Sequence, residues 1–368
     1  MSGRIVLFGA TGYTGELTAR ALADRGARPV LAARDARRLE ELAARLGGLE
    51  TRVADVAAPA TVARLVERGD VLISTVGPFA RLGGPAVEAA VAAGAHYLDS
   101  TGEGAFVRAV FERHGPAAAA VSCGLLTAFG YDWVPGNLAG ALALREAGGG
   151  AARVDVGYFL TGRPGAGAAS GGTRATAVAG LLAPAHAWRG GRLVTEPPAR
   201  RVRAFDVDGG HRAEAVSVGS SEHFALPRLQ PGLRDVGVYL GWAGSLSRAV
   251  QLLSAGASVV GLVPGAREAV GALLRPLAAG STGGPDAEAR ARVGSLVVAE
   301  AFDAGGTRLS AVRLTGVNPY DFTAAILAWG AQTAAGGGLQ GAGALGPVDG
   351  FGLEALVRGC AEAGISRA

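Results

Sequence analysis

The sequence predicts an α/β protein in which an N-terminal doubly wound parallel sheet is combined with an α+β domain. In the first part of the chain, short apolar runs alternate with helical patterns rich in Ala, Leu and Arg, which is typical of βαβ units. After Trp133 to Asn137 the strand patterns become longer and alternate between apolar and polar residues, which indicates an antiparallel sheet. A chain of 368 residues also exceeds one average domain, so two domains are expected.

The first domain is expected to span residues 1–136. Its strands are predicted at 5–9, 29–33, 50–54, 71–75, 96–99 and 125–128. Helices should fill the intervals, for example at 15–24 and 37–46, and Asp35 is the expected N-cap of the second helix.

The second domain is expected to span residues 137–340 and to contain a largely antiparallel sheet. Its strands are predicted at 154–160, 213–218, 295–302 and 308–314, and the turn residues from Asp303 to Gly306 indicate a hairpin. Helical patterns are predicted at 173–188, at 246–277 with breaks, and at 321–334.

Composition narrows the possible functions. The chain contains 35 arginines and no lysine, so a lysine Schiff base is excluded. The net charge of +4 is spread along the chain without basic blocks, which argues against nucleic-acid binding. Cys123 and Cys360 lie far apart and show no metal-binding spacing, and the histidines form no paired motif, so no metal site is expected and a reducing cytoplasm fits.

Two uncharged stretches approach the length of a membrane span. The stretch at 249–266 is interrupted by glycines and a proline, and the stretch at 322–348 becomes glycine-rich from Gly336. Both are therefore expected to be buried segments instead of stable membrane insertions. The chain also begins directly with a strand pattern, so no signal peptide is expected.

A glycine-rich loop follows the first predicted strand and opens the first predicted helix. It reads Gly9, Ala10, Thr11, Gly12, Tyr13, Thr14 and Gly15. In this context the first glycine permits a tight turn, the second allows close approach of a pyrophosphate, and the third lets the helix pack on the strand. The alternative is a tight turn without a ligand. The placement favours a Rossmann dinucleotide site made by Gly9, Thr11, Gly12, Tyr13, Thr14 and Gly15.

The residue after the second strand indicates which dinucleotide is bound. An NAD-selective site usually offers a carboxylate there, whereas this chain offers Arg34. A guanidinium can bind the 2′-phosphate of NADP(H), and Arg37 or Arg38 could add a second cation. The alternative is an ion pair between Arg34 and Asp35. After the third strand, Asp55 and Val56 are placed to contact adenine, although a strand-end cap explains Asp55 equally well.

Several motifs together resemble the saccharopine dehydrogenase-like reductases, including their trans-acting enoyl reductase branch. They are GATGYTG at 9–15, VGPFARLGGPAVEAAVAAGAHYLDSTGE at 76–103, GYDWVPGNLAG at 130–140, SGGT at 170–173 and NPYDFTAAILAWGAQ at 318–332. The resemblance implies a Rossmann domain with an inserted α+β substrate and dimerisation domain, so that residues 341–368 return to the first domain. It also implies a homodimer.

The resemblance further implies which residues surround the nicotinamide half of the cofactor. They are Gly77, Pro78, Phe79, Asp99, Thr101, Gly102 and Glu103. One departure stands out, because many relatives read Cys-Gly-Phe-Asp where this chain reads Phe129, Gly130, Tyr131 and Asp132. A role tied to that cysteine is therefore not carried over.

Reduction by NADPH requires a proton as well as a hydride, so a donor is expected near the strand ends. Tyr131, Asp132 and Glu103 are candidates from the first domain, with Tyr131 preferred because a neutral phenol adds no buried charge. His223, in the Ser220 to His223 cluster, is the candidate from the second domain. Structural roles remain the alternative for each.

The substrate class stays open at this point. Arg163 and Arg174 could bind the carboxylate of an imine substrate, whereas the apolar 249–266 segment could line the path of an enoyl or polyketide chain. The expected function is an NADPH-dependent reductase of a C=C or C=N bond in a small metabolite. The alternative is a redox sensor or scaffold that binds NADP(H) without turnover.

Overall fold

The computed structural model describes residues 3–162, 170, 183–208, 210–242, 247–249, 251–252, 254 and 283–368. The chain divides into two compact units. The first comprises Met1–Gly102, Phe106–Val134 and Pro319–Gly364, and the second comprises Glu103–Ala105, Pro135–Asn318 and Ile365–Ala368. The helix that begins at Pro319 therefore belongs to the first unit, whereas the predicted boundary at residue 340 would leave it in the second domain. The predicted boundaries otherwise stay predictions.

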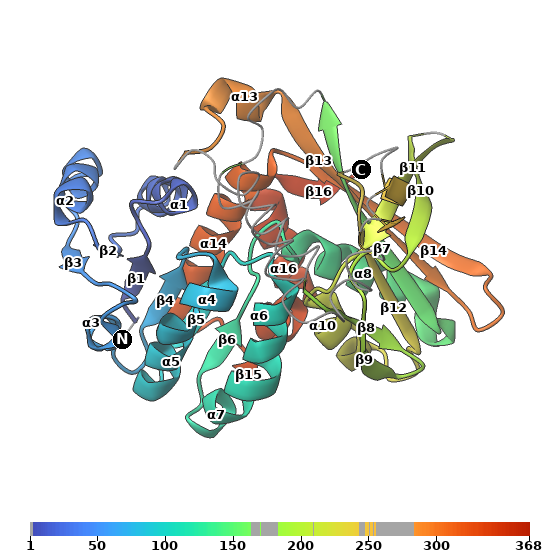
Figure 1. Cartoon of the computed structure of the whole chain (residues 1–368), viewed down its shortest axis with the longest axis horizontal. Helices are drawn as coiled ribbons and strands as arrows, with labels where there is room; N and C mark the ends of the chain where they lie inside the picture. Colours follow the sequence, from blue (N-terminus) through green and yellow to red (C-terminus); the bar gives the residue numbers. More distant parts are fainter. Residues whose placement is uncertain are drawn as a thin grey trace. The chain divides into compact units, whose positions relative to one another are not determined.

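The first unit is built on a sheet of seven parallel strands (Figure 1). Its strands are β1 (Ile5–Phe8), β2 (Val30–Ala33), β3 (Thr51–Val53), β4 (Val71–Ser74), β5 (His96–Asp99), β6 (Gly124–Leu126) and β15 (Gly343–Ala344). Their order is β3-β2-β1-β4-β5-β6-β15, so the direction of winding reverses between β1 and β4. This order is that of a Rossmann fold, which confirms the predicted doubly wound sheet.

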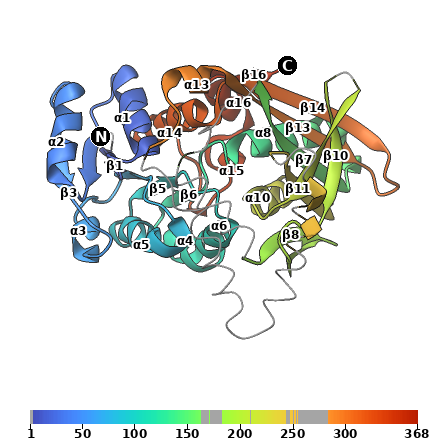
Figure 2. The same ribbon diagram turned by 45° about the horizontal axis from the view of Figure 1, so that its top comes forward.

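Helices cover both faces of this sheet. They are α1 (Tyr13–Asp24), α2 (Ala36–Arg45), α3 (Pro59–Ala63), α4 (Phe79–Leu82), α5 (Gly84–Ala93), α6 (Gly104–Ala109), the π-helical turn η1 (Val110–His114), α7 (Gly115–Ala120), α14 (Pro319–Ala335), α15 (Pro347–Phe351) and α16 (Leu353–Glu362). Figure 2 shows α1, α2 and α14 on one face and α3 and α5 on the other. The predicted cap of α2 is present, because the Asp35 side chain accepts a hydrogen bond from the Arg38 amide at 3.1 Å.

Helix α14 connects the C-terminal part of the chain to the N-terminal part of the same unit. It packs against α1 and against the face of β4 and β5. At its C-terminal end, Gln332 accepts a hydrogen bond from Arg25 at 2.7 Å. Close packing is also visible at Gly330, where an added Cβ would lie 2.5 Å from the Phe129 ring. The long apolar pattern at 321–334 thus forms a buried helix, and its first turn contacts Tyr13 and the backbone of Tyr131.

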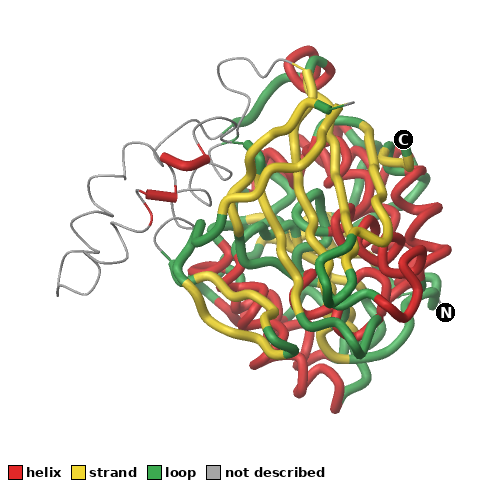
Figure 3. The backbone as a smooth tube through the Cα atoms, turned by 90° about the vertical axis from the view of Figure 1, so that its right-hand side faces the viewer, coloured by secondary structure: helices red, strands yellow, loops and turns green. Residues whose placement is uncertain are grey.

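The second unit contains a mixed sheet of nine strands, several of which are seen as neighbouring yellow stretches of the tube in Figure 3. They are β7 (Arg153–Gly162), β8 (Ala185–Arg189), β9 (Arg192–Glu196), β10 (Val202–Asp208), β11 (His211–Ser217), β12 (Asp235–Leu240), β13 (Val293–Phe302), β14 (Arg308–Gly316) and β16 (Ile365–Arg367). Its pairs are antiparallel except β12 with β7. The predicted hairpin between β13 and β14 is confirmed by the Asp303 amide, which donates to the Thr307 carbonyl at 3.0 Å.

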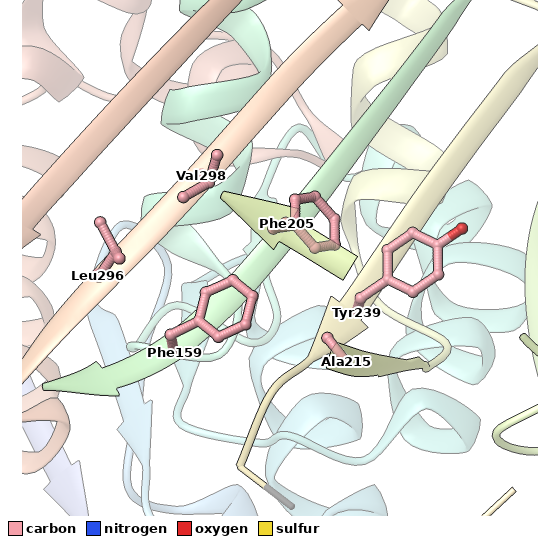
Figure 4. Close-up of a cluster of buried hydrophobic side chains, with 6 residues drawn as sticks. All are labelled: Phe159, Phe205, Ala215, Tyr239, Leu296 and Val298. Atoms are coloured by element: carbon pink, nitrogen blue, oxygen red, sulfur yellow. The ribbon is translucent and has the colours of Figure 1, made fainter. Parts of the chain in front are cut away.

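The two faces of this second sheet bury different residues because side chains alternate along a strand. Helices α8 (Val134–Ala147) and α10 (Glu222–Leu229) lie on the Tyr158 side, where the Gly136 amide donates to the Tyr158 hydroxyl at 2.8 Å. Phe159 points to the opposite face and packs in an apolar cluster (Figure 4). The short elements of the unit are the 3-10 turn η2 (Gly148–Gly150) and α13 (Ala287–Ala291).

One predicted helix of the second domain is wrong where it can be checked. Of the helix expected at 173–188, residues Ala185 to Trp188 belong to strand β8. This strand pairs with β9 in an antiparallel hairpin. Gly190 and Gly191 form the turn between them, and their φ angles of 58° and 79° suit a tight hairpin turn. The rest of that segment and most of the 246–277 pattern lie outside the described residues. Within the described part of the chain, no helix is long and apolar enough to cross a membrane.

Candidate functional site

The turn from β1 into the start of α1 requires glycine at two positions. Gly9 has a φ of +91°, a conformation that side chains disfavour. An added Cβ on Gly15 would lie 2.1 Å from the Gly9 carbonyl oxygen. The Gly12 amide donates to that same oxygen at 2.9 Å, which closes the turn. The loop therefore has the tight strand-to-helix geometry predicted from its sequence.

The outer side of this loop fits a phosphate group. Gly12 is exposed, and a Cβ added there would meet only the Gly9 oxygen at 3.3 Å, so backbone faces open space. Helix α1 has no side-chain cap at its N-terminus, and the amides at the N-terminus of a helix favour an anion. Thr11, Tyr13 and Thr14 complete this segment between Gly9 and Gly15. These features fit the pyrophosphate of a dinucleotide.

Arg34 lies exposed after β2 and forms no ion pair or hydrogen bond among the described residues. The alternative pairing with Asp35 is absent, since that carboxylate caps α2. Arg37 instead pairs with Glu41 at 2.6 Å. Arg38 donates to the Thr11 carbonyl at 3.2 Å and so braces the glycine loop. Of the three arginines, Arg34 is the one left available for a 2′-phosphate.

The residues predicted to contact adenine lie after β3. Asp55 accepts a hydrogen bond from the Ala57 amide at 2.9 Å, so it caps the turn that begins there. Val56 is partly exposed beside it. The capping role considered for Asp55 from sequence is therefore present, while its contact with adenine stays a prediction.

The loop after β4 lies beside the glycine loop. Thr75 donates its hydroxyl hydrogen bond to the Gly9 carbonyl at 3.1 Å. Gly77 is exposed, Pro78 precedes α4, and Phe79 is buried against Phe106 with ring centroids 5.6 Å apart. Anchored by Phe79, this segment lies at the carboxyl edge of the sheet next to the topological switch point, where dinucleotides bind in such folds.

Asp99 joins the loops that follow β5 and β6. Its side chain is fully buried, and its Oδ1 accepts hydrogen bonds from the amides of Thr101 at 2.9 Å and Ala128 at 2.8 Å. Burial raises the pKa of Asp99 to about 6, although the two amide donors oppose that rise. Thr101 and Gly102 are thereby held at the same edge as the strand-end loop that carries Tyr131 and Asp132. Glu103, the next residue, is also buried.

Asp132 has a more strongly raised pKa than Asp99. Its Oδ1 atom is inaccessible to solvent and has no hydrogen-bond partner among the residues that the structure describes. Its Oδ2 atom lies 2.6 Å from the place where a Cβ on Gly102 would stand, so any larger residue at 102 would force the carboxyl group to move. Burial raises the pKa of Asp132 to about 7. A substantial share of Asp132 is therefore protonated at neutral pH.

Tyr131 is fixed by a ring contact and by a hydrogen bond from its backbone amide. Its ring is 2% exposed and meets the edge of Phe322 with centroids 6.4 Å apart. Its amide donates to the Thr323 hydroxyl at 3.0 Å. The sequence placed Tyr131 and Asp132 at this strand end, and the structure does so as well. Their contact with the nicotinamide stays a prediction.

Residues 5–121 match the family model described as the saccharopine dehydrogenase NADP binding domain. This stretch of the first unit is therefore similar to the NADP binding domain of saccharopine dehydrogenases. Over 140 residues the chain is 41% identical to a trans-acting enoyl reductase of Mycobacterium leprae and 40% identical to one of Mycobacterium ulcerans. Each match covers 36% of this chain and 34% of the relative, so the chain spans about a third of these relatives.

A solved structure extends the likeness to both units. The saccharopine dehydrogenase (L-Glu forming) from Saccharomyces cerevisiae matches 97% of this chain with 96% of its own, at a TM-score of 0.59 and 13% identity. This match shows that the fold is shared. The predicted resemblance to the saccharopine dehydrogenase-like family is thus confirmed, and the family match supports NADP(H) as the cofactor.

His223, expected near a proton-transfer site, belongs to the second unit and not to the NADP-binding domain. It lies in α10, is 1% exposed, and its Nδ1 lies 3.2 Å from the Ser220 hydroxyl. Burial and the neighbouring His186 lower its pKa well below 6.5. The ring is therefore uncharged at neutral pH, which argues against a role as proton donor.

The predicted substrate-binding segments are only partly visible. Arg163, Arg174 and three residues of the SGGT motif lie outside the described residues, and Ser170 is buried. Most of the apolar 249–266 segment also lies outside them.

Sequence reasoning missed two residues that contact the site loops of the NADP-binding domain. Tyr320 packs against Tyr13, and Thr323 binds the Tyr131 amide. Their motif was noticed as part of a C-terminal helix, but nothing in its spacing indicated that its first turn would meet loops about two to three hundred residues earlier.

Proposed function

We propose that the protein is an NADPH-dependent reductase that acts on the C=C bond of an enoyl or polyketide-type substrate. The observation that carries this proposal is a carboxylic acid, Asp132, whose Oδ1 is buried without a hydrogen-bond partner among the described residues, in the same unit as the segment that matches an NADP binding domain. Similarity to trans-acting enoyl reductases over a third of the chain favours C=C over the C=N bond of an imine.

The cofactor would bind along the edge of the first sheet. The loop 9–15 would hold the pyrophosphate, Arg34 the 2′-phosphate, and Asp55 with Val56 the adenine. The nicotinamide half would lie among Gly77, Pro78, Phe79, Thr101, Gly102 and Glu103. When bound, NADPH supplies the hydride, and the protein's task is to orient it and to provide a proton.

Asp132 is the proposed source of that proton. As hydride adds to one carbon of the double bond, the developing negative charge is neutralised by the proton of the Asp132 carboxyl, which solvent later restores. Sequence alone favoured Tyr131 for this step. The unpartnered Oδ1 of Asp132 and its pKa of about 7 now favour the neighbouring acid, because an efficient general acid has a pKa near the working pH.

Single-turnover kinetics at saturating NADPH test this assignment. The two probes are an enoyl-pantetheine thioester and a cyclic imine carboxylate. Asp132→Asn should slow reduction by about 10²-fold or more, whereas Tyr131→Phe and His223→Ala should change the rate much less. An unchanged rate in Asp132→Asn would remove the acid role, and a loss confined to Tyr131→Phe would transfer it to the phenol.

The same experiment separates enzyme from sensor. Tight NADPH binding without oxidation by either probe would support the alternative of a non-catalytic redox sensor or scaffold. Faster reduction of the imine than of the enoyl thioester would make C=N the substrate bond.

Two further proposals concern the whole molecule. The sheet of the second unit has β10 and β16 at the two ends of its path, and an end strand offers backbone groups for pairing with a second copy. A homodimer through this sheet is the proposed state, and light scattering that reports a monomer at micromolar concentration would refute it. Buried free thiols at Cys123 and Cys360 suit the proposed cytoplasmic location.

A further inference from the structure

The first turn of α14 contacts two loops that are far apart in the sequence. Tyr320 and Thr323 stand three residues apart, a spacing that places side chains on neighbouring positions of one helix surface. Tyr320 contacts Tyr13 at the start of α1, and Thr323 contacts the loop that carries Asp132. All these residues belong to the first unit.

Thr323 binds the loop of the proposed proton donor. Its hydroxyl accepts a hydrogen bond from the Tyr131 amide at 3.0 Å and donates one to the Pro319 carbonyl at 2.7 Å. Gly130 permits this approach, because a Cβ there would lie 2.9 Å from the Thr323 methyl carbon. The hydroxyl is thus fixed by its own helix and in turn fixes the backbone one residue before Asp132.

Tyr320 packs on the loop proposed to hold the pyrophosphate. Its ring meets that of Tyr13 edge to face, with centroids 5.1 Å apart and an interplanar angle of 86°. Tyr13 directly follows Gly12 and is the first residue of α1. Both rings are partly exposed, so the pair lies at the surface where the cofactor would approach.

We propose that the first turn of α14 is a positioning element, in which Tyr320 sets the cofactor loop and Thr323 sets the loop of Asp132. This inference rests on the proposed function. It assigns the two residues separable effects, since Tyr320 acts on cofactor binding and Thr323 acts on the chemical step. Neither residue needs to touch the reacting atoms.

Four variants and one matched control test whether Tyr320 acts on cofactor binding and Thr323 on the chemical step. Thr323→Val removes the hydroxyl at constant shape and should lower the single-turnover rate about tenfold, because small displacements of a catalytic group are costly, while the dissociation constant of NADPH stays within about twofold. Thr323→Ser should restore the rate. Tyr320→Ala should weaken NADPH binding about tenfold with a far smaller effect on the saturated rate, and Tyr320→Phe should preserve binding.

Thr333→Val is the control. Thr333 lies on the same helix and donates to the Trp329 carbonyl at 2.8 Å, which is the same intrahelical bond that Thr323 makes to Pro319. It contacts neither site loop through a hydrogen bond in the described structure. Loss of this bond should leave both NADPH affinity and rate unchanged, so an effect of Thr323→Val cannot be assigned to the helix alone.

Hydrogen exchange of the Tyr131 amide supplies a readout that needs no substrate. Thr323→Val should speed its exchange markedly, and Thr333→Val should not. Unchanged exchange, or equal losses of affinity and rate in Thr323→Val and Tyr320→Ala, would overturn the inference. If wild-type protein neither binds NADPH nor reduces a probe, the proposed function fails. If the wild-type protein binds NADPH and reduces a probe, but Thr323→Val and Tyr320→Ala change affinity and rate alike, only the positioning role fails.

Discussion

Asp132 and Gly102 are packed so closely that the residue at 102 determines where the carboxyl group can stand. A Cβ at Gly102 would lie 2.6 Å from Asp132 Oδ2, which is the flexible end of a side chain and can move away. Gly102→Ala should therefore cost little stability but displace the proposed acid. We expect a single-turnover rate lowered by about tenfold or more with a melting temperature close to wild type. A variant that keeps the wild-type rate would show that the position of this carboxyl is unimportant.

Two glycines of the first loop should separate cofactor binding from folding. Gly12 faces open space, so Gly12→Val should leave circular dichroism unchanged but abolish NADPH binding by filling the place of the pyrophosphate. Gly15→Val, in contrast, should destabilise the protein itself, because its Cβ would stand 2.1 Å from the Gly9 oxygen. Calorimetric titration and thermal melts measure the two effects. Micromolar NADPH binding by a folded Gly12→Val protein would rule out this loop as the phosphate site.

Arg34 should determine the preference for NADPH over NADH. Because it forms no ion pair with its neighbour Asp35, its guanidinium is available for a charge-assisted bond to the 2′-phosphate, worth about 1.5 to 3 kcal/mol. Wild type should bind NADPH at least about tenfold more tightly than NADH, and Arg34→Ala should lose most of that difference. Arg37→Ala is the matched control, since Arg37 is paired with Glu41. Equal affinities for both cofactors in wild type would refute the role of Arg34.

The first sheet could be predicted because its signals are local. Each strand is a short apolar run, and the glycine loop and the Asp35 cap depend on residues a few positions apart. The β8–β9 hairpin was missed because the Ala-rich 173–188 pattern also has helical character, although Gly190-Gly191 was a usable turn signal.

The site was predictable at its strand ends but not in its chemistry. Sequence placed Tyr131 and Asp132 beside each other, yet which of them is the better acid depends on burial and on missing hydrogen-bond partners, which arise only from packing. His223 shows the same limit, because burial, with a smaller contribution from His186, lowers its pKa, and both arise only from packing.

The perturbed carboxyl should also be visible in stability as a function of pH. The pKa of Asp132 is about 7 in the folded protein and about 4 in the unfolded chain, so the folded state retains a proton that the unfolded state loses between these values. Stability from this group is therefore fully present below about pH 4 and is lost as pH rises through about 7. Asp132→Asn removes the cost of burying the charge, so it should raise the melting temperature most at pH 8 and least at pH 4, while it lowers the rate of reduction. Glu40→Gln, which removes an exposed carboxyl, controls for the change in net charge. A melting difference between Asp132→Asn and wild type that is the same at both pH values would show that Asp132 titrates normally, and the proposed acid would lose its physical basis.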